Sequence, residues 1–227
     1  MTTPRKSIPA DSERAKGYFD RLAPEYDRAF RSRGRDPVNV FVNRFFRGRT
    51  FAQRMRRLES IFVDVGLEGR SILDLGCGSG QVSLLAASMG ASVVGIDIAP
   101  RMLEIARRAA SEASLSGRVH FEEGDVATAA LPAADVVLLI GVIEYYRDFA
   151  GLVRRAAEAA GRTLIVAHTN RVPYRMLLRR LLFAIRGAAL YFHPMDEVVA
   201  AGEAAGARLA RRVADHAFTI LVFERTA

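Results

Sequence analysis

From residue 71 onward, the chain alternates short apolar runs with amphipathic segments of helical length. Strands separated by helices are typical of βαβ units, so this alternation predicts an α/β fold with a mostly parallel sheet and helices on both faces. The predicted strands are residues 71–75, 92–96, 119–122, 135–140 and 163–168, and the predicted helices between and after them are residues 81–89, 100–113 and 149–160.

The end of the chain departs from this alternation. A helix is predicted at about residues 194–205, followed by strands at residues 208–213 and 216–224. The turn between these two strands is too short for the crossover that a parallel pair needs, so they should pair antiparallel.

The first 70 residues contain helical patterns and no strand pattern. Helices are predicted at residues 12–22, 38–47 and 50–64. We therefore expect residues 1–68 to form a helical cap and residues 69–227 to form the core.

The segment "DLGCGSG", from Asp74 to Gly80, follows the first predicted strand. A dinucleotide-binding loop would need a third glycine where Gln81 stands, and a P-loop would need a Gly-Lys pair, which is absent. The carboxylate of Asp74 would also repel a phosphate. The same carboxylate suits a ligand with an ammonium or sulfonium group, and S-adenosylmethionine (SAM) carries both and no phosphate.

Two further acids follow the next two strands. Asp97 ends the second strand, where a carboxylate can bind the two hydroxyls of a ribose. Asp125 follows the third strand, where an acid can accept from an adenine amino group. The alternative for Asp97 and Asp125 is helix N-capping. Because parallel strands end at one edge of a sheet, three acids at three successive ends favour a ligand site there.

These segments resemble known motifs. "ILDLGCGSG", "VVGIDIAPRMLEIAR" and "FEEGDV" resemble the first three motifs of the class I SAM-dependent methyltransferases, and "ADVVLLIGVIEYYRD" resembles the fourth. The resemblance implies a seven-stranded Rossmann-like sheet, SAM as methyl donor and a glycine loop against its methionine part. The cofactor-binding residues predicted on this basis are Asp74, Gly76, Gly78, Gly80, Asp97, Ile98, Asp125, Val126, Ile140 and Tyr18.

The resemblance also implies an N-terminal helix that closes over the cofactor. "YFDRLAPEYDRAF", residues 18–30, is similar to that segment. Tyr18 and Tyr26 would then contact cofactor or acceptor, although both could equally pack the cap.

Several acceptor classes are excluded. The fourth motif reads Ile140-Gly141-Val142-Ile143 and not the Asn/Asp-Pro-Pro-Tyr of enzymes that methylate amines in nucleic acids. The single cysteine lies in the glycine loop, so no nucleophile for pyrimidine C5 methylation is available. The histidines have no metal-ligand spacing, and no metal site is predicted.

The acceptor side should be built from the cap, the ends of the fourth and fifth strands and the segment that follows. The chain from Gly141 on is similar to the magnesium-protoporphyrin and quinone O-methyltransferase branches, although Glu144 replaces a histidine of the porphyrin branch. Four residues are the catalytic candidates: His168, Glu144, His193 and Tyr26. A structural alternative stands for each: a buried hydrogen-bonded histidine, a helix-start carboxylate, a turn residue and cap packing.

Charge is concentrated in two stretches of a chain whose net charge is +8. Residues 31–57 contain nine arginines and one acid, and residues 171–192 contain five arginines and no acid. The second stretch is predicted to be an amphipathic helical insertion that packs on the sheet edge, covers a hydrophobic acceptor or lies on an anionic membrane.

The predicted function is SAM-dependent O-methylation of a hydrophobic, anionic small molecule such as an isoprenoid quinone, porphyrin or polyketide. The alternatives are an RNA methyltransferase and a SAM-binding protein without catalysis; nucleic acid is not the expected partner. One cysteine and no apolar leader or span predict a cytoplasmic protein, with membrane contact through residues 171–192 as an option.

Overall fold

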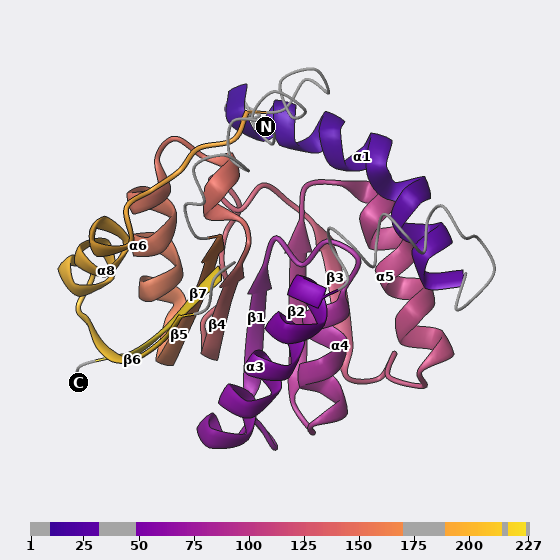
Figure 1. Cartoon of the computed structure of the whole chain (residues 1–227). Coiled ribbons are helices and arrows are strands. Elements are labelled where there is room, and N and C mark those ends of the chain that lie inside the picture. Colours follow the sequence, from indigo (N-terminus) through magenta and orange to yellow (C-terminus); the bar gives the residue numbers. More distant parts are fainter. Residues whose placement is uncertain (1–9, 32–48, 170–188, 215–217, 226–227) are drawn as a thin grey trace, which may run out of the picture.

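The computed structural model describes residues 10–31, 49–169, 189–214 and 218–225. The seven strands form one sheet in the order β3-β2-β1-β4-β5-β7-β6 (Figure 1). β7 pairs antiparallel with β5 and β6, and the other neighbours are parallel, as predicted. The strands are β1 (Ser71–Leu75), β2 (Ser92–Asp97), β3 (Val119–Glu123), β4 (Ala134–Ile140), β5 (Ala160–Thr169), β6 (Ala207–Ala214) and β7 (Phe218–Arg225).

Helices cover both faces of this sheet. The described helices are α1 (Ala10–Arg31), α3 (Arg49–Val65), α4 (Gln81–Ser88), α5 (Pro100–Glu112), the 3₁₀ turn η2 (Ile143–Tyr145), α6 (Phe149–Ala159) and α8 (Met195–Ala204). α3, α4 and α5 pack on one face, and α6 and α8 pack on the other (Figure 1). The predicted helix at 38–47 and most of the insertion at 171–192 lie outside the described residues.

The apolar run of β4 shows why a strand at the centre of this sheet is apolar throughout. Val136, Leu138 and Ile140 belong to one buried cluster, and Val137 and Leu139 belong to the other. Successive side chains of a strand point to opposite faces, so both faces of β4 are packed against helices.

α3 differs from the expectation that residues 1–68 form a cap. Leu58, Ile61 and Phe62 are buried in the same cluster as Ile72 of β1 and Val136 of β4. α3 is therefore part of the helical layer on the sheet. Helical periodicity predicts that one face is buried, but it does not predict which surface buries it.

α1 forms the cap. It lies across the carboxyl edge of the parallel strands (Figure 1). It also continues to Arg31, well past the predicted end at residue 22, with Pro24 inside it. Ala23 and Tyr26 pack against Met102 and its neighbours at the start of α5, so tertiary contacts support the helix beyond the proline.

β5 begins three residues earlier than predicted. Ala160 caps α6 with extended backbone angles (φ −78°, ψ 118°), so the chain passes from the helix directly into the strand without a turn.

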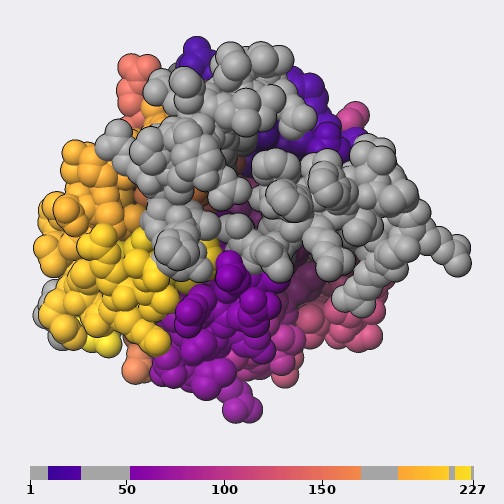
Figure 2. Space-filling model, in the orientation of Figure 1, coloured from indigo at the N-terminus to yellow at the C-terminus, as the bar shows by residue number. Residues whose placement is uncertain are grey.

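The outermost strand, β6, carries three arginines that pair with acids from three other elements. Arg208 contacts Glu224 of β7 at 2.6 Å, Arg212 contacts Asp196 of α8 at 3.5 Å, and Arg211 contacts Asp64 of α3. Figure 2 shows α3 and this C-terminal hairpin side by side on the surface that faces the viewer.

The packing of α3 gives a matched pair of substitutions. Phe62 is fully buried, whereas Val63 beside it is 65% exposed. We expect Phe62→Ala to lower the free energy of unfolding by about 3–5 kcal/mol and Val63→Ala to change it by about 0.5 kcal/mol or less, measured by urea unfolding. Equal effects of the two variants would contradict the packing of α3 on the sheet.

Candidate cofactor and acceptor site

The glycine loop turns sharply after β1. Gly76, Gly78 and Gly80 have positive φ angles of 71°, 54° and 77°. A Cβ on Gly76 would lie 2.4 Å from Cγ2 of Val142, so a side chain is excluded there by both backbone angle and space. A Cβ on Gly78 would meet only Cε of Met102, at 3.7 Å. The loop therefore packs tightly at its start and leaves room at its middle glycine.

Asp97 fixes this loop to the end of β2. Its Oδ2 accepts the backbone N–H of Gly78 at 2.7 Å, and its Oδ1 accepts that of Ala99 at 2.9 Å. Burial raises the pKa of Asp97 to about 6 against these two hydrogen bonds, which lower it. A carboxylate oxygen has two lone pairs, so each oxygen can accept one further donor.

Asp74, in β1 directly before the glycine loop, is buried. It is in the middle of the sheet, paired with Gly95 on one side and Leu138 on the other. Its Oδ2 accepts from the hydroxyl of Ser83 in α4 at 2.6 Å, and only 2% of the residue is exposed. Burial, with a smaller contribution from the charge of Asp97, raises the pKa of Asp74 to about 6. Because its side chain is buried, Asp74 would act on a ligand through its charge and not by direct contact.

Asp125 follows β3, and its two carboxylate oxygens differ in their hydrogen-bond partners. Oδ1 accepts from the backbone N–H of Ala127 at 2.9 Å and from the hydroxyl of Tyr146 at 3.1 Å. Oδ2 is buried and has no hydrogen-bond partner among the described residues. Unpartnered buried carboxylate oxygens are rare, and a donor on a ligand would satisfy this one.

The apolar residues predicted to contact the cofactor differ in access. Val126 and Ile140 are buried in the two core clusters. Ile98 is half-buried at the start of the β2–α5 connection.

The cap helix brings an aromatic cluster over this edge. Tyr18 is buried against Leu22 and Leu190, and Phe19, Tyr26, Tyr145 and Phe192 pack around them. The ring of Phe19 meets that of Tyr145 edge-on, with 5.0 Å between the centroids. Tyr18 thus packs the cap, while Tyr26 is half-buried at the rim of the cluster.

Polar contacts hold the first part of α1 to the sheet edge. Asp11 accepts the backbone N–H of Arg147 at 3.0 Å and the hydroxyl of Tyr191 at 2.8 Å. One turn further on, Lys16 contacts Glu123 at the end of β3 at 2.9 Å. The cap is therefore joined to both the cofactor side and the opposite side of the edge.

Glu144 and His168 form a buried pair at the ends of β4 and β5. Glu144 Oε1 accepts the backbone N–H and the hydroxyl of Thr169 at 3.0 and 2.7 Å. The same oxygen lies 3.7 Å from Nδ1 of His168. Nε2 of His168 lies 3.1 Å from the backbone oxygen of His193, so this nitrogen carries the proton.

His193 is also held inside. Its Nε2 lies 3.1 Å from the backbone oxygens of both Ile143 and Tyr146, and its ring stacks on Phe149 at 4.1 Å. Burial lowers the pKa of His193. These contacts place His168, Glu144 and His193 as groups that join the η2 turn, β5 and the segment before α8, and their catalytic roles stay predictions.

Arg54 was not singled out from the sequence. A Cβ on Gly141, directly after β4, would lie 3.3 Å from Nη1 of Arg54 in α3. A guanidinium therefore lies at the carboxyl edge between the cofactor and acceptor sides. The arginine-rich composition of residues 31–57 contained this signal, but composition alone does not show which arginine reaches the site.

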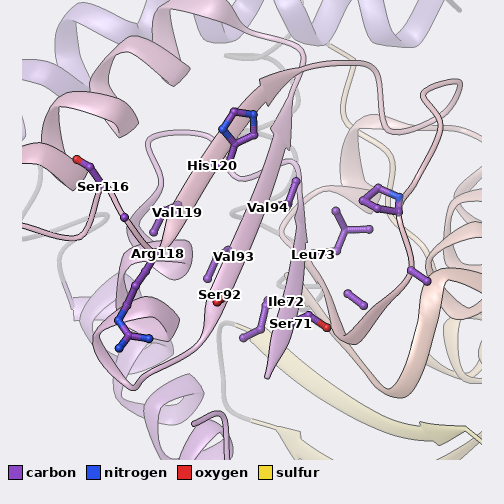
Figure 3. A pocket seen from close by; sticks show the side chains of 14 residues that line it. Ser71, Ile72, Leu73, Ser92, Val93, Val94, Ser116, Arg118, Val119 and His120 are labelled. Carbon is purple, nitrogen blue, oxygen red and sulfur yellow. The ribbon is translucent and has the colours of Figure 1, made fainter. Parts of the chain in front are cut away.

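A separate groove lies at the other end of the strands. It has a volume of about 340 Å³ and runs along the starts of β1, β2 and β3, where Ser92, Arg118 and His120 line it (Figure 3). The β3–β4 connection that borders it, residues 124–133, contains no helix. The groove is remote from the three acids and is not the predicted site.

Within the described ranges, no group of three or more His, Cys, Asp or Glu side chains is gathered as a metal site requires. Among the described helices, none is long and apolar enough to cross a bilayer.

Comparison with known proteins agrees with this geometry. Residues 72–161 match the family described as "Methyltransferase domain". The ubiquinone biosynthesis O-methyltransferase of Methylocella silvestris is 38% identical over 124 residues, which is 54% of this chain and 46% of that protein. The chain spans about half the length of the curated relatives it matches.

Solved structures extend the likeness to nearly the whole chain. Magnesium protoporphyrin IX methyltransferase from Synechocystis PCC 6803, with bound SAH, superimposes with a TM-score of 0.77 at 25% identity, covering 93% of this chain and 98% of that one. The [4+2]-cyclase SpnF superimposes with a TM-score of 0.71 at 17% identity, covering 98% and 100%, and shares the fold.

The sheet order, the acids at three strand ends and these matches agree with one another. Residues 72–161 are similar to a methyltransferase domain, and the described fold is similar to that of the class I SAM-dependent methyltransferases.

The raised pKa of Asp74 gives a test by pH. A folded pKa of about 6 against 3.8 in the unfolded chain means that the native state binds more protons between these values, so stability falls as pH rises through that window. We expect Asp74→Asn to raise the free energy of unfolding at pH 7 by ~1–3 kcal/mol and to change it little at pH 4, measured by urea unfolding.

Asp135 is the control, because its pKa is shifted in the opposite direction from that of Asp74. Hydrogen bonds from Ser71 lower its pKa, so its contribution is present at neutral pH and is lost as pH falls. Asp135→Asn should lower stability at pH 7. An Asp74→Asn variant that also loses stability at pH 7 would show that its carboxylate is not destabilised by burial.

Two substitutions of Glu144 can separate the contribution of its hydrogen bonds to stability from that of its charge. Glu144→Ala leaves the N–H and hydroxyl of Thr169 without their acceptor, and we expect a loss of about 2–4 kcal/mol in urea unfolding. Glu144→Gln keeps an acceptor oxygen and should lose clearly less. If both variants lost the same amount, the charge and not the hydrogen bonds would be the stabilising feature.

Proposed function

We propose that this protein binds SAM and transfers its methyl group to an oxygen of a hydrophobic, anionic small molecule of quinone, porphyrin or polyketide type. The observation that carries the proposal is the row of acids at one sheet edge, above all the unpartnered Oδ2 of Asp125. SAM presents an amino group, two ribose hydroxyls, an ammonium and a sulfonium, all of which are donors or cations. An edge rich in buried acceptors suits such a ligand and disfavours a phosphate.

The described residues fit SAM part by part. Asp97, whose two oxygens already accept backbone N–H groups, would bind the ribose hydroxyls with its remaining lone pairs. Asp125 Oδ2 would accept from the adenine amino group, and half-buried Ile98 would lie against the ring. The open middle of the glycine loop, at Gly78, would approach the methionine part. Arg54, beside Gly141, suits an anionic group at this edge.

SAM supplies a methyl group already activated by its sulfonium, so the work left to the chain is alignment and the exclusion of water. The aromatic cluster of α1, Tyr145 and Phe192 provides an apolar surface for a flat acceptor. The contacts of Asp11 and Lys16 hold α1 over the edge and exclude water.

The acceptor class rests on two supports. The relatives named above are O-methyltransferases of ubiquinone biosynthesis, and a structural neighbour acts on magnesium protoporphyrin IX. A carboxylate acceptor needs no base, and a phenol needs one. His168 and His193 have their Nε2 atoms engaged with backbone oxygens, so a phenol acceptor would have to use Nδ1 of one of them as its base.

The proposal is tested first by binding. In calorimetry with S-adenosylhomocysteine, we expect micromolar affinity, and we expect Asp97→Ala to weaken it by about 100-fold because two hydrogen bonds to a charged group are lost. His120→Ala, on the remote groove, is the matched control and should bind as the unmodified protein does. Absence of binding would overturn the proposal.

Catalysis is tested by transfer of a labelled methyl group from SAM. Three acceptors are offered in parallel: a polyprenylated catechol, magnesium protoporphyrin IX and total RNA. We expect label in one of the two organic-soluble acceptors and none in RNA. Label in RNA would identify the alternative activity, and binding without transfer to any cell-extract fraction would indicate a SAM-binding protein without catalysis.

A further inference from the structure

Tyr146, in the segment that resembles the fourth motif, is a buried residue whose hydroxyl has a specific partner. Its hydroxyl donates to Oδ1 of Asp125, 21 positions earlier in the chain. Burial, and then the charge of Asp125, raise the pKa of this phenol, so it keeps its proton and acts as the donor. Ser12 of α1, fully buried, lies beside the same hydroxyl. Tyr146 therefore stands between the cap and the carboxylate.

Tyr146 is itself held in place. Its backbone oxygen accepts from Nε2 of His193 at 3.1 Å, and its side chain packs in the core cluster that contains Val126 and Ile143. Only 6% of the residue is exposed. A hydroxyl anchored in this way can fix the orientation of the carboxylate that it contacts.

The loop that carries Asp125 is held independently of Tyr146. Nε of Arg155 donates to the backbone oxygen of Val126 at 3.2 Å, and its NH2 donates to that of Ala129. Loss of the Tyr146 hydroxyl should therefore leave the loop in place and alter only how the Asp125 carboxylate is turned.

The two donors on Oδ1 determine which oxygen is left for a ligand. Ala127 N–H and Tyr146 O–H both occupy Oδ1, and the buried Oδ2 has no partner among the described residues. We propose that Tyr146 is a positioning residue for cofactor recognition: it holds Asp125 so that Oδ2 accepts the exocyclic amino group of the adenine. This inference rests on the proposed function.

The arrangement predicts how the site tells one purine from another. Adenine presents an amino donor where hypoxanthine presents a carbonyl oxygen. A fixed Oδ2 attracts the first and repels the second. The ratio of affinities for S-adenosylhomocysteine and S-inosylhomocysteine therefore reports on the orientation of Asp125, and a general loss of stability would not change this ratio selectively.

The test measures both affinities by calorimetry. We expect the unmodified protein to prefer S-adenosylhomocysteine and Tyr146→Phe to reduce that preference about tenfold, since one hydrogen bond to a charged group is lost. Tyr191→Phe is the matched control. It loses a hydroxyl that donates to Asp11 in the cap, at 2.8 Å, and should leave the ratio unchanged.

A second variant should reverse the preference between the two ligands. In Asp125→Asn, the two donors should hold the amide oxygen at the Oδ1 position and so place the amide NH2 at the Oδ2 position. The site then offers a donor, and the preference should invert toward S-inosylhomocysteine. In Asp125→Asn combined with Tyr146→Phe, the inversion should shrink, because one of the two orienting donors is gone.

The possible results distinguish a failure of the proposed function from a failure of this inference alone. No binding of S-adenosylhomocysteine by the unmodified protein overturns the proposed function and this inference with it. Binding with an unchanged ratio in Tyr146→Phe overturns the inference alone. If circular dichroism shows that Tyr146→Phe does not fold, Asp125→Asn decides, and an unaltered preference in that variant overturns the inference.

Discussion

The candidate site depends on one buried carboxylate. Asp97 accepts an N–H from the glycine loop with one oxygen and an N–H from the β2–α5 connection with the other. Removing an ionised carboxylate from water costs several kcal/mol unless donors replace the water. Because the donors here are backbone groups of two different loops, the charge is tolerated only when both loops are in place.

The same principle joins the two halves of the site. The cofactor side consists of strand ends and the loops after β1, β2 and β3. The other side consists of α1, η2, the end of β5 and the segment before α8. A buried hydrogen bond from Tyr146 to Asp125 crosses between them, and so does the contact of Lys16 in α1 with Glu123 at the end of β3. These contacts tie the position of the cofactor side to that of the other side. The sheet itself can be shared by proteins with different acceptors.

Much of the fold could be predicted from the sequence, because the central strands of the sheet are buried on both faces and are mostly apolar. The turn between β6 and β7 was also informative, since its length excludes a crossover. The role of α3 and the continuation of α1 past Pro24 could not be predicted. Both depend on which surface a helix packs against, and its own periodicity does not contain that information.

The site divides in the same way. The three acids could be predicted because the end of each strand can be located in the sequence, and each acid lies at or just after such an end. The depth of Asp74, the hydroxyl that Tyr146 directs at Asp125 and the guanidinium of Arg54 beside Gly141 depend on side chains that meet across the fold. Spacing along the chain gives no signal for such meetings.

The arginines of β6 have a consequence for the protein in solution. A strand at the end of a sheet leaves backbone donors and acceptors that another polypeptide could pair with. On β6, the side chains of Arg208, Arg211 and Arg212 are about half exposed or more and are turned toward acids of β7, α3 and α8. A strand that paired with β6 would have to place its backbone next to these charged side chains. The open margin of the sheet is thereby protected from intermolecular β-pairing, and a crowded solution of the protein resists aggregation by that route.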